Sequence, residues 1–586
     1  MCGITGICNF NSKNLSIVKK MNFIQAHRGP DSEGYYYDKI NKVCLGMTRL
    51  AIIGLTSGNQ PQYSQNKNII LVFNGEIYNY KELGLFYFNK RYTSDSKLIV
   101  DLYQKLGIAF LSKLNGMFSI AIYDKLKKKV FLVRDRFGIK PLYYLYANKT
   151  LYFSSELKTL HNSINFNFKI NEQVAWNYFS LGYCNTSQSI YDDIKKVDSG
   201  TYLEFNVKNN KIKKNKWWNL NLKEINLKNK SEYYELILDK FVNAIKYWSI
   251  SDVPICFMVS GGLDSSLISY FYSKLHKKKV NTCSLGFKDK IFDKWNELSS
   301  VSKLTKKIKS NHFNIFLNND KFLEEFNNIV DNLDEPFGGG LPSWYFFKNV
   351  SKKYKVVISG VGGDELFGNY NRPFNFLDKC KVLNRVNFNK IYSAQNFTCN
   401  EIWKKRFLAL NNSKMENTSD FFFRKLRENL KEMNLIKGLS FLDLQTQLQD
   451  DFLYLTDRFS MSHSLEVRTP FLDHELVEAV FSLPENIRIS KNNYKPILKN
   501  FSKKYLPKIY HNYPKKGFSL PLSIFMRNKL KPDLIRVLSK KNLKKNDVID
   551  KSFYDEYVEP MLNGNNQNIQ LIWNVFMFQC WLEKNN

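Results

Sequence analysis

Chemistry could begin at the second residue of this 586-residue chain. Cys2 is small enough that removal of the initiator methionine is expected, which would leave a thiol and a free α-amine on one residue. An α-amine has an unperturbed pKa of about 7.7–8.0, so it can act as the base for its own side chain. The sequence therefore predicts a nucleophilic cysteine, although position alone would favour an accidental one.

Two glycine turns carry acids. The turn at 260–265 (SGGLDS) follows an apolar run, and the turn at 359–365 (SGVGGDE) follows a second one. A glycine turn at a helix N-terminus presents N–H groups to an anion, and no Walker lysine is present. Two carboxylates, Asp264 and Asp364, could hold Mg²⁺ beside a triphosphate. The alternatives are a plain strand–turn–helix connection and acids stabilised by the helix dipole.

Short strands and turns dominate the first two hundred residues. Strand-like segments occur at 70–80, 114–124, 130–144 and 151–160, and Asp95 opens a helix. This pattern is typical of stacked antiparallel sheets with flanking helices.

The order of these segments resembles the glutaminase domain of class II glutamine amidotransferases, the N-terminal-nucleophile group. The resemblance covers 2–205 and rests on Cys2 together with AHRGPD (26–31), TRLAIIG (48–54) and FNGEIYNY (73–80). It implies an αββα sandwich in which Cys2 attacks the side-chain amide of glutamine.

The same resemblance assigns the glutamine-binding residues. Asn74 and Gly75 would form the oxyanion hole, where fixed donors stabilise developing charge. Arg49 would hold the α-carboxylate of glutamine, and Glu76 and Asp95 would bind its α-ammonium. Taken singly, Arg49 could be a surface ion pair and Asn74-Gly75 a hairpin turn.

The second half of the chain predicts a different architecture. A polar boundary lies at about 200–235, and an amphipathic helix (231–249) then leads into a buried strand at 255–259. Two strands that each end in a glycine turn with an acid suit a doubly wound parallel sheet, whose ligands bind beyond the carboxyl ends of the strands. The pattern downstream is mostly helical.

The full order of motifs resembles the glutamine-hydrolysing asparagine synthetase family. It runs from the glutaminase blocks through SGGLDSS and SGVGGDE to DRFSMSHSLEVRTPFLDH (457–474). The resemblance implies an ATP-pyrophosphatase domain with added helices over 230–586. It also implies glutamine-dependent amidation of a carboxylate through an acyl-adenylate, with release of AMP and pyrophosphate, and an apolar tunnel for ammonia.

By this resemblance the synthetase domain binds ATP with Mg²⁺ and needs no organic prosthetic group. Asp264 and Asp364 would hold the metal, and Lys495 would neutralise the departing pyrophosphate. The nucleotide-binding residues would be Val259, Ser260, Gly261, Gly262, Asp264, Ser265, Leu285, Ser359, Gly360 and Lys495.

Two features depart from the family pattern on the acceptor side. Val361 stands where relatives usually carry Asp or Glu, which could accept a proton from attacking ammonia. The run LDEPFGGG (333–340) has three glycines where relatives often carry Ser, Ala or Asp. Aspartate is the favoured acceptor, and another carboxylic acid is the alternative. A binding protein that has lost synthetase turnover is a third hypothesis.

The composition of the chain bears on which classes of molecule it binds. The net charge of +33 would suit a nucleic-acid binder, but the lysines are spread over the chain. The runs KLKKK (125–129) and KIKKNK (211–216) both predict turns. The nine cysteines have no zinc spacing and are expected to be mostly buried, as in a reduced compartment. We therefore expect a cytoplasmic enzyme of small molecules that binds neither membrane nor nucleic acid; a homodimer is left open.

Overall fold

The structure is a computed structural model of the chain. It describes residues 2–9, 15–185, 188–276, 279–288, 296–317, 324–368, 372–410, 412–491, 493, 495–511 and 522–585.

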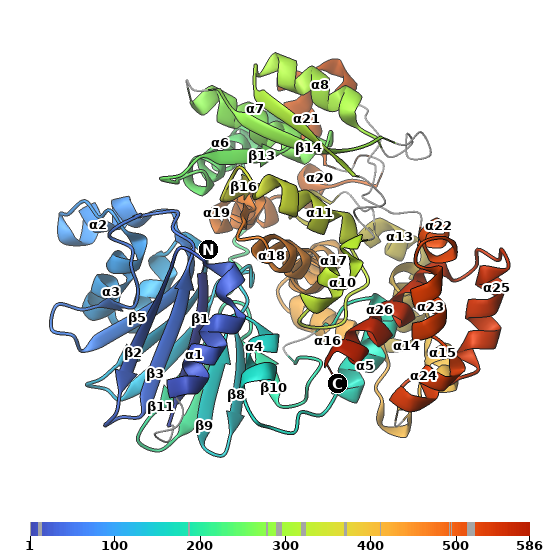
Figure 1. The fold of residues 1–586 in the computed structure, drawn as a ribbon. Coiled ribbons are helices and arrows are strands. Elements are labelled where there is room, and N and C mark those ends of the chain that lie inside the picture. The colour runs from blue at the N-terminus through green and yellow to red at the C-terminus, as the bar shows by residue number, and fades with distance from the viewer. Residues whose placement is uncertain are drawn as a thin grey trace.

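Two antiparallel sheets form the N-terminal half, drawn in blue to cyan in Figure 1. In spatial order, the first sheet contains β10 (Ile194–Lys196), β8 (Tyr143–Ala147), β9 (Thr150–Ser154), β1 (Cys2–Cys8), β3 (Val43–Arg49) and β2 (Ser32–Asp38). The second contains β12 (Lys211–Lys216), β11 (Thr201–Asn206), β7 (Lys129–Arg134), β6 (Gly116–Asp124), β5 (Ile69–Ile77) and β4 (Gln62–Tyr63).

The two sheets pack face to face and are covered by helices. Strand β1 lies against β5, and apolar side chains such as Ile4, Leu45, Val72 and Leu132 fill the space between the sheets. The flanking helices are α1 (Leu15–Ile24), α4 (Leu157–Ser163), α2 (Tyr80–Phe88) and α3 (Asp95–Leu106). Helices α1 and α4 cover the first sheet and α3 covers the second, so the predicted αββα sandwich is confirmed.

A parallel sheet organises the C-terminal half. Its order is β15 (Asn311–Leu317), β14 (Asn281–Phe287), β13 (Ile255–Met258), β16 (Val356–Ile358) and β17 (Glu466–Arg468), and every neighbouring pair is parallel. The predicted buried strand is β13, and the predicted helix before it is α6 (Lys230–Trp248). Both glycine turns therefore leave neighbouring strands at the same edge of one sheet.

Helices surround this sheet and extend beyond it (Figure 1). Those nearest the sheet are α7 (Leu263–Leu275), α8 (Leu298–Lys307), α11 (Leu341–Val350), α12 (Gly363–Phe367), α18 (Tyr454–Met461), α19 (His474–Phe481), α20 (Glu485–Arg488) and α21 (Pro496–Tyr505). The others include α5 (Glu172–Leu181), α10 (Phe326–Asp331), α13 (Arg372–Lys379), α14 (Arg385–Asn396), α15 (Glu401–Phe407), α16 (Thr418–Asn429), α17 (Leu435–Asp443), a π-helical stretch (Leu444–Leu453), α22 (Leu522–Arg527), α23 (Lys531–Val537), α24 (Lys540–Asn546), α25 (Glu559–Leu562) and α26 (Ile569–Asn585).

One sequence expectation is wrong in part. The run 125–129 includes the predicted turn between β6 and β7, but 211–216 forms β12. Strand β12 pairs with β11 at the edge of the second sheet, where exposed lysines are common because they discourage further strand pairing. The domain limits 2–205 and 230–586 stay a prediction, and the second sheet continues to Lys216. Within the described ranges, no helix combines the length and apolarity that crossing a bilayer requires.

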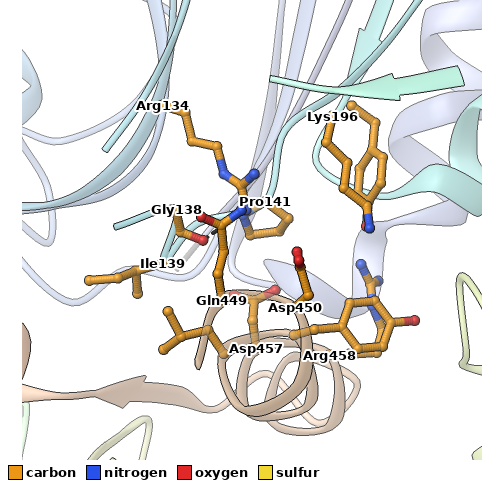
Figure 2. A pocket seen from close by; sticks show the side chains of 12 residues that line it. Arg134, Gly138, Ile139, Pro141, Lys196, Gln449, Asp450, Asp457 and Arg458 are labelled. Atoms are coloured by element: carbon orange, nitrogen blue, oxygen red, sulfur yellow. Dashed lines mark hydrogen bonds between the residues drawn. The ribbon is translucent and has the colours of Figure 1, made fainter. Parts of the chain in front are cut away.

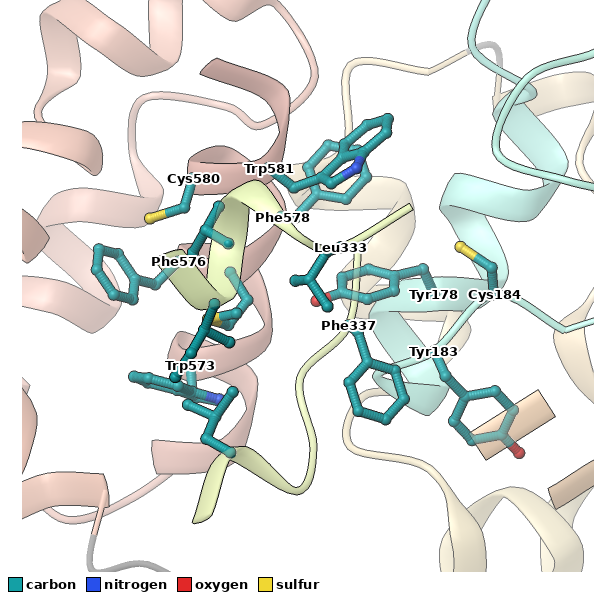
Figure 3. Packing of buried hydrophobic residues seen from close by; sticks show 14 of the residues in the cluster. Tyr178, Tyr183, Cys184, Leu333, Phe337, Trp573, Phe576, Phe578, Cys580 and Trp581 are labelled. Carbon is teal, nitrogen blue, oxygen red and sulfur yellow. The ribbon is translucent and has the colours of Figure 1, made fainter. Parts of the chain in front are cut away.

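An apolar contact joins the two halves. Tyr178 and Phe179 of α5 pack on Phe578 of α26. Figure 3 shows Tyr178, Phe337 and Phe578 in this cluster. The hydroxyl of Tyr178 donates to the carbonyl of Asn574 at 3.0 Å. Helix α26 is buried along most of its length, so it acts as a core helix for both halves.

Buried charges form the other part of this interface. Arg28 donates through both terminal nitrogens to Asp457, at 2.9 and 3.1 Å, and through Nη1 to Glu156 at 3.1 Å. Arg458 pairs with the same Glu156 at 2.5 Å and with Asp334 at 2.6 Å. Figure 2 shows the adjoining cavity, where Arg134 and Lys196 face Gln449, Asp450, Asp457 and Arg458 across the domain boundary.

The buried acid Glu156 of this cluster stays ionised because its cationic partners lower its pKa. Burial alone would raise the pKa of Glu156, but Arg458 and His27 keep it well below its usual value. Removing one partner of a buried ion pair leaves the other charge uncompensated, which costs far more than losing a surface pair.

We predict that Arg28→Ala lowers the free energy of unfolding by about 3–5 kcal/mol, because Asp457 stays buried without the guanidinium that donates to both of its oxygens. Chemical denaturation measures this change. The matched control is Arg385→Ala, because Arg385 is exposed and pairs with Asp420 at 2.6 Å, so its loss should cost much less stability than the loss of Arg28. Equal losses in the two variants would contradict a special role for the buried pair.

Candidate functional site

Cys2 lies at the start of β1, directly opposite Arg49 in the register with β3. Its backbone N–H donates to Oδ1 of Asn74 at 3.0 Å, which joins the end of the first sheet to β5 of the second. Burial raises the pKa of the thiol. The predicted nucleophile therefore sits in a protected position next to two of the residues predicted to act with it.

Gly75 is the position where the backbone of β5 requires glycine. Its φ is +149°, and a Cβ there would lie 2.1 Å from the carbonyl oxygen of Met117 on β6. A side chain would clash with the neighbouring strand, so this conformation next to Asn74 excludes other residues.

Glu76 and Asp95 place two carboxyl groups beside this cysteine end of the sheet. Asp95 opens α3, and its Oδ2 accepts from the backbone N–H of Ile77, the next residue but one after Gly75, at 3.0 Å. Burial raises the pKa of Asp95 to about 6. Burial, together with Glu466 and Asp95, also raises the pKa of Glu76.

Arg49 supplies a buried cation at the end of β3. Its guanidinium donates to the carbonyls of Leu55, Ile53 and Gly54 and to Asn59, at 2.7–3.2 Å. Asp252 of the C-terminal half accepts from the N–H of Gly54 at 2.8 Å and so braces this loop. Within the described ranges no carboxylate forms an ion pair with Arg49, which leaves its charge available to an anionic group.

The glycine turn after β13 begins α7. The Ser265 hydroxyl accepts from the N–H of Ser260 at 3.2 Å, which closes the turn over five residues. Gly261 has a φ of +81°, so the turn requires the freedom of glycine there. A Cβ at Gly360 would lie 3.0 Å from the N atom of Ser265, so the second glycine turn packs directly on the first.

Lys495 brings the two acids of these turns together. Its ammonium lies 2.7 and 2.6 Å from the oxygens of Asp264 and 2.5 Å from Asp364. Burial lowers the pKa of Lys495, but the two carboxylates outweigh that effect and raise it. The ammonium occupies the place where the two carboxylates converge. A metal ion bound by these acids would take the same place.

This donor set fits Mg²⁺, which usually binds proteins through one or two carboxylates plus substrate phosphates and water. In the described ranges, no group of three or more His, Cys, Asp or Glu side chains could hold a metal ion. The two-carboxylate pair is therefore suited to a metal that arrives with its nucleotide.

The structure thus brings the sequence-predicted residues together in two groups. One group lies at the start of β1 and the end of β5 and contains Cys2, Arg49, Asn74, Gly75, Glu76 and Asp95. Val259, Ser260, Gly261, Gly262, Asp264, Ser265, Ser359, Gly360, Asp364 and Lys495 form the other at the carboxyl edge of the parallel sheet. Leu285 lies on β14, half-buried, in the strand next to β13.

The two departures from the family pattern, the glycines at 338–340 and Val361, have different packing environments. A Cβ at Gly338 would meet Asn574 at 2.4 Å, and one at Gly340 would meet Leu455 at 1.7 Å. Packing against α26 and α18 therefore accounts for these two glycines. Val361 is half-buried, its side chain packs at the border of the apolar core that contains Leu472 and Phe471, and its N–H donates to the Ser359 hydroxyl at 3.3 Å.

Sequence reasoning missed Glu466, Arg468 and Asp252. Glu466 and Arg468 alternate on β17 within the motif SLEVRTPFLDH, and Arg468 lies 3.8 Å from Glu76 of the other half. Two opposite charges two residues apart on a short buried strand were the available signal. Their partner lies almost four hundred residues away in sequence, so the contact itself was not predictable from spacing.

Two family models match the chain. The glutamine amidotransferase domain matches residues 1–218, and asparagine synthase matches residues 236–583. The chain belongs to the asparagine synthase family.

Curated relatives align along most of this family member. It is 26% identical to "Asparagine synthetase [glutamine-hydrolyzing] 1" of Bacillus subtilis strain 168, over 99% of this chain and 96% of the relative. It is 30% identical to "Asparagine synthetase [glutamine-hydrolyzing] 2" of the same organism, over 88% of this chain and 72% of the relative. A "Putative asparagine synthetase [glutamine-hydrolyzing] 2" of Methanocaldococcus jannaschii is 35% identical over 64% of this chain and 76% of the relative.

These matches confirm the expected family, its amidotransferase half and its enzyme class. This asparagine synthase family member is a ligase of the amidotransferase type, and glutamine-dependent amidation is its class of activity.

Asp95 yields a prediction on stability. A carboxyl with a folded-state pKa of about 6 and an unfolded value of 3.8 binds more protons folded than unfolded. Its contribution to stability therefore falls as pH rises from about 4 to about 6, by about 2–3 kcal/mol in total. We predict that Asp95→Asn gains stability relative to the wild type across this window.

Urea denaturation at pH 4.5 and at pH 7.5 measures that difference. Asp101→Asn is the control on the same helix, because Asp101 is only half-buried and pairs with Lys97 at 3.4 Å. A gap between Asp95→Asn and the wild type that stays constant with pH would contradict the assignment.

Proposed function

We propose that this enzyme transfers the amide nitrogen of glutamine to the side-chain carboxylate of aspartate and cleaves ATP to AMP and pyrophosphate. The observation that carries the proposal is the pair of residue groups: a buried terminal cysteine beside Asn74, and two acids bridged by Lys495. The names of the relatives support the same reaction.

Hydrolysis of glutamine is the first half-reaction. The α-amine of the mature Cys2 takes the thiol proton, and the thiolate attacks the amide carbon. The side-chain N–H of Asn74 and the N–H of Gly75 stabilise the resulting oxyanion. Collapse to a thioester expels ammonia, and water then releases glutamate and the free thiol.

Glutamine is held by charges at both ends of its α-carbon. Arg49 binds the α-carboxylate, because it is a buried cation whose hydrogen bonds go to neutral groups. Glu76 and Asp95 bind the α-ammonium. Among the residues that the structure describes, the buried Oε2 of Glu76 has no hydrogen-bond partner, which supports this role.

Activation of the acceptor is the second half-reaction. The acceptor carboxylate attacks the α-phosphorus of ATP, which forms the acyl-adenylate and releases pyrophosphate; ammonia then displaces AMP. The glycine turns receive the phosphates through their N–H groups. Asp264 and Asp364 would hold Mg²⁺, which when bound neutralises phosphate charge, and Lys495 would turn from these acids to the departing pyrophosphate.

Val361 favours a second candidate acceptor, another small carboxylic acid. Valine can neither accept a proton from the attacking ammonia nor bind a substrate ammonium. Position 361 lies in the turn next to Gly360 and Gly362, beside the proposed adenylate. An acceptor that needs no carboxylate from the protein at this point would suit the valine.

We predict that Cys2→Ala abolishes pyrophosphate release and amide formation with glutamine but leaves both within about twofold of the wild type with ammonium. Aspartate-dependent release of pyrophosphate, with asparagine identified by mass spectrometry, measures the activity. Cys8→Ala at the other end of β1 is the control and should keep the glutamine reaction. The proposed function would be contradicted if the rate of pyrophosphate release were the same with and without aspartate, and the same with and without each acid of a panel of carboxylic acids.

We predict that Val361→Glu raises aspartate-dependent amidation by about 100-fold or more, because the new carboxylate supplies the base that relatives carry. The measurement is kcat/KM for aspartate with ammonium as nitrogen source. Val361→Gln, which matches the shape without the base, should gain little. No gain with aspartate, together with turnover of another acid by the wild type, would establish the second candidate.

A further inference from the structure

The proposed glutamine site is not built by the N-terminal half alone. Nη2 of Arg468, on β17 of the parallel sheet, lies 3.8 Å from Oε1 of Glu76. Arg468 is fully buried and Glu76 is 4% exposed, so little water screens this pair. A cation of the synthetase half thus faces the carboxylate proposed to bind the ammonium of glutamine.

The rest of the Arg468 guanidinium is held in place. Its Nε pairs with Glu466 at 2.5 Å, and its Nη1 donates to the carbonyls of Trp248 at 3.1 Å and Ile250 at 2.5 Å. The guanidinium also lies 5.2 Å from the ring centre of Tyr78. These contacts fix Nη2 in the direction of Glu76.

The contact between Arg468 and Glu76 affects the protonation of Glu76. Burial raises the pKa of Glu76, and Glu466 and Asp95 raise it further, whereas Arg468 is the side chain that lowers it most. A protonated Glu76 could not attract a substrate ammonium. Arg468 therefore favours the ionised carboxylate that the proposed binding role needs.

The backbone of the same residue touches the other site. The carbonyl oxygen of Arg468 accepts from the N–H of Ser359 at 2.8 Å, and Arg468 is paired with Ile358 in the register of β16 and β17. Ser359 begins the second glycine turn, and its hydroxyl accepts from the N–H of Val361 at 3.3 Å. The side chain of Arg468 thus faces Glu76 of the proposed glutamine site, and its main chain hydrogen-bonds to the nucleotide turn.

We propose that Arg468 is a positioning residue of the glutamine site, supplied by the synthetase half, and that it couples glutamine binding to occupancy of the nucleotide turn. The inference rests on the proposed function. A shift of the turn at 359–361 when nucleotide binds moves β17 and changes how Arg468 meets Glu76. Such coupling is reciprocal, because each ligand changes the affinity for the other by the same factor.

A purely structural ion pair is the competing explanation. It predicts that replacing Arg468 lowers stability and leaves the affinity of the folded protein for glutamine unchanged. Binding has to be measured apart from turnover, so the experiment uses the Cys2→Ala enzyme, which keeps glutamine intact.

Calorimetric titration of Cys2→Ala with glutamine, alone and with ATP and Mg²⁺, is the test. We expect Cys2→Ala/Arg468→Met to bind glutamine at least about tenfold more weakly and to lose the effect of ATP on glutamine affinity. Arg468→Lys, which keeps the charge but not the fork that holds the two carbonyls, should recover part of the affinity. The matched control is Arg488→Met, also buried, whose hydrogen bonds go to Ser440 and Leu366.

Hydrogen exchange on Cys2→Ala provides a measurement that needs no change at Arg468. Saturating glutamine should slow exchange in peptides covering 466–468 and 359–361, which belong to the other half of the protein. No change in these peptides would overturn the coupling even if Arg468→Met failed to fold.

These experiments distinguish failure of the inference about Arg468 from failure of the proposed function. Unaltered glutamine affinity in folded Arg468→Met would overturn the inference and leave the proposed function standing. Failure of Cys2→Ala itself to bind glutamine would overturn the proposed function and the inference together. A tenfold loss confined to the Arg468 variants, with Arg488→Met unchanged, is the result that the inference predicts.

Discussion

The alternating buried charges between the two halves are the constraint on which the rest of the structure depends. Arg28 and Glu156 from one half meet Asp457 and Arg458 from the other, and each charge needs its partner because the site excludes water. These pairs link the antiparallel sheets to the helix that carries Asp457 and Arg458. The resulting placement of the two halves brings β17 against the end of β5, so the glutamine and nucleotide groups share a boundary.

This placement gives each site features that neither half could supply alone. Asp252 braces the loop that holds Arg49, and Arg468 faces Glu76. The carboxylates near Cys2 sit in surroundings that disfavour their charged forms, and the cations around them offset that cost. The same principle operates at the nucleotide turns, where Lys495 keeps Asp264 and Asp364 compensated.

Local patterns made much of this predictable from sequence. The apolar runs before the two glycine turns indicated the parallel strands β13 and β16, and the capped start of α3 placed Asp95, because each signal lies within a few residues. The edge strand β12 was missed because its lysine-rich sequence has a turn-like composition, while the strand is decided by pairing with β11. The Arg468–Glu76 contact and the packing of Gly338 on Asn574 depend on segments far apart in sequence, so no local pattern contains them.

The central claim is that one protein carries nitrogen from the cysteine site to an activated carboxylate at the other site. The most direct measurement supplies glutamine labelled with ¹⁵N in its amide, together with excess unlabelled ammonium, ATP, Mg²⁺ and aspartate, and reads the isotope in the product by mass spectrometry. The account predicts that the product amide carries mostly ¹⁵N, because nitrogen passes within the joined halves. A product that reflects the bulk ammonium pool would contradict it.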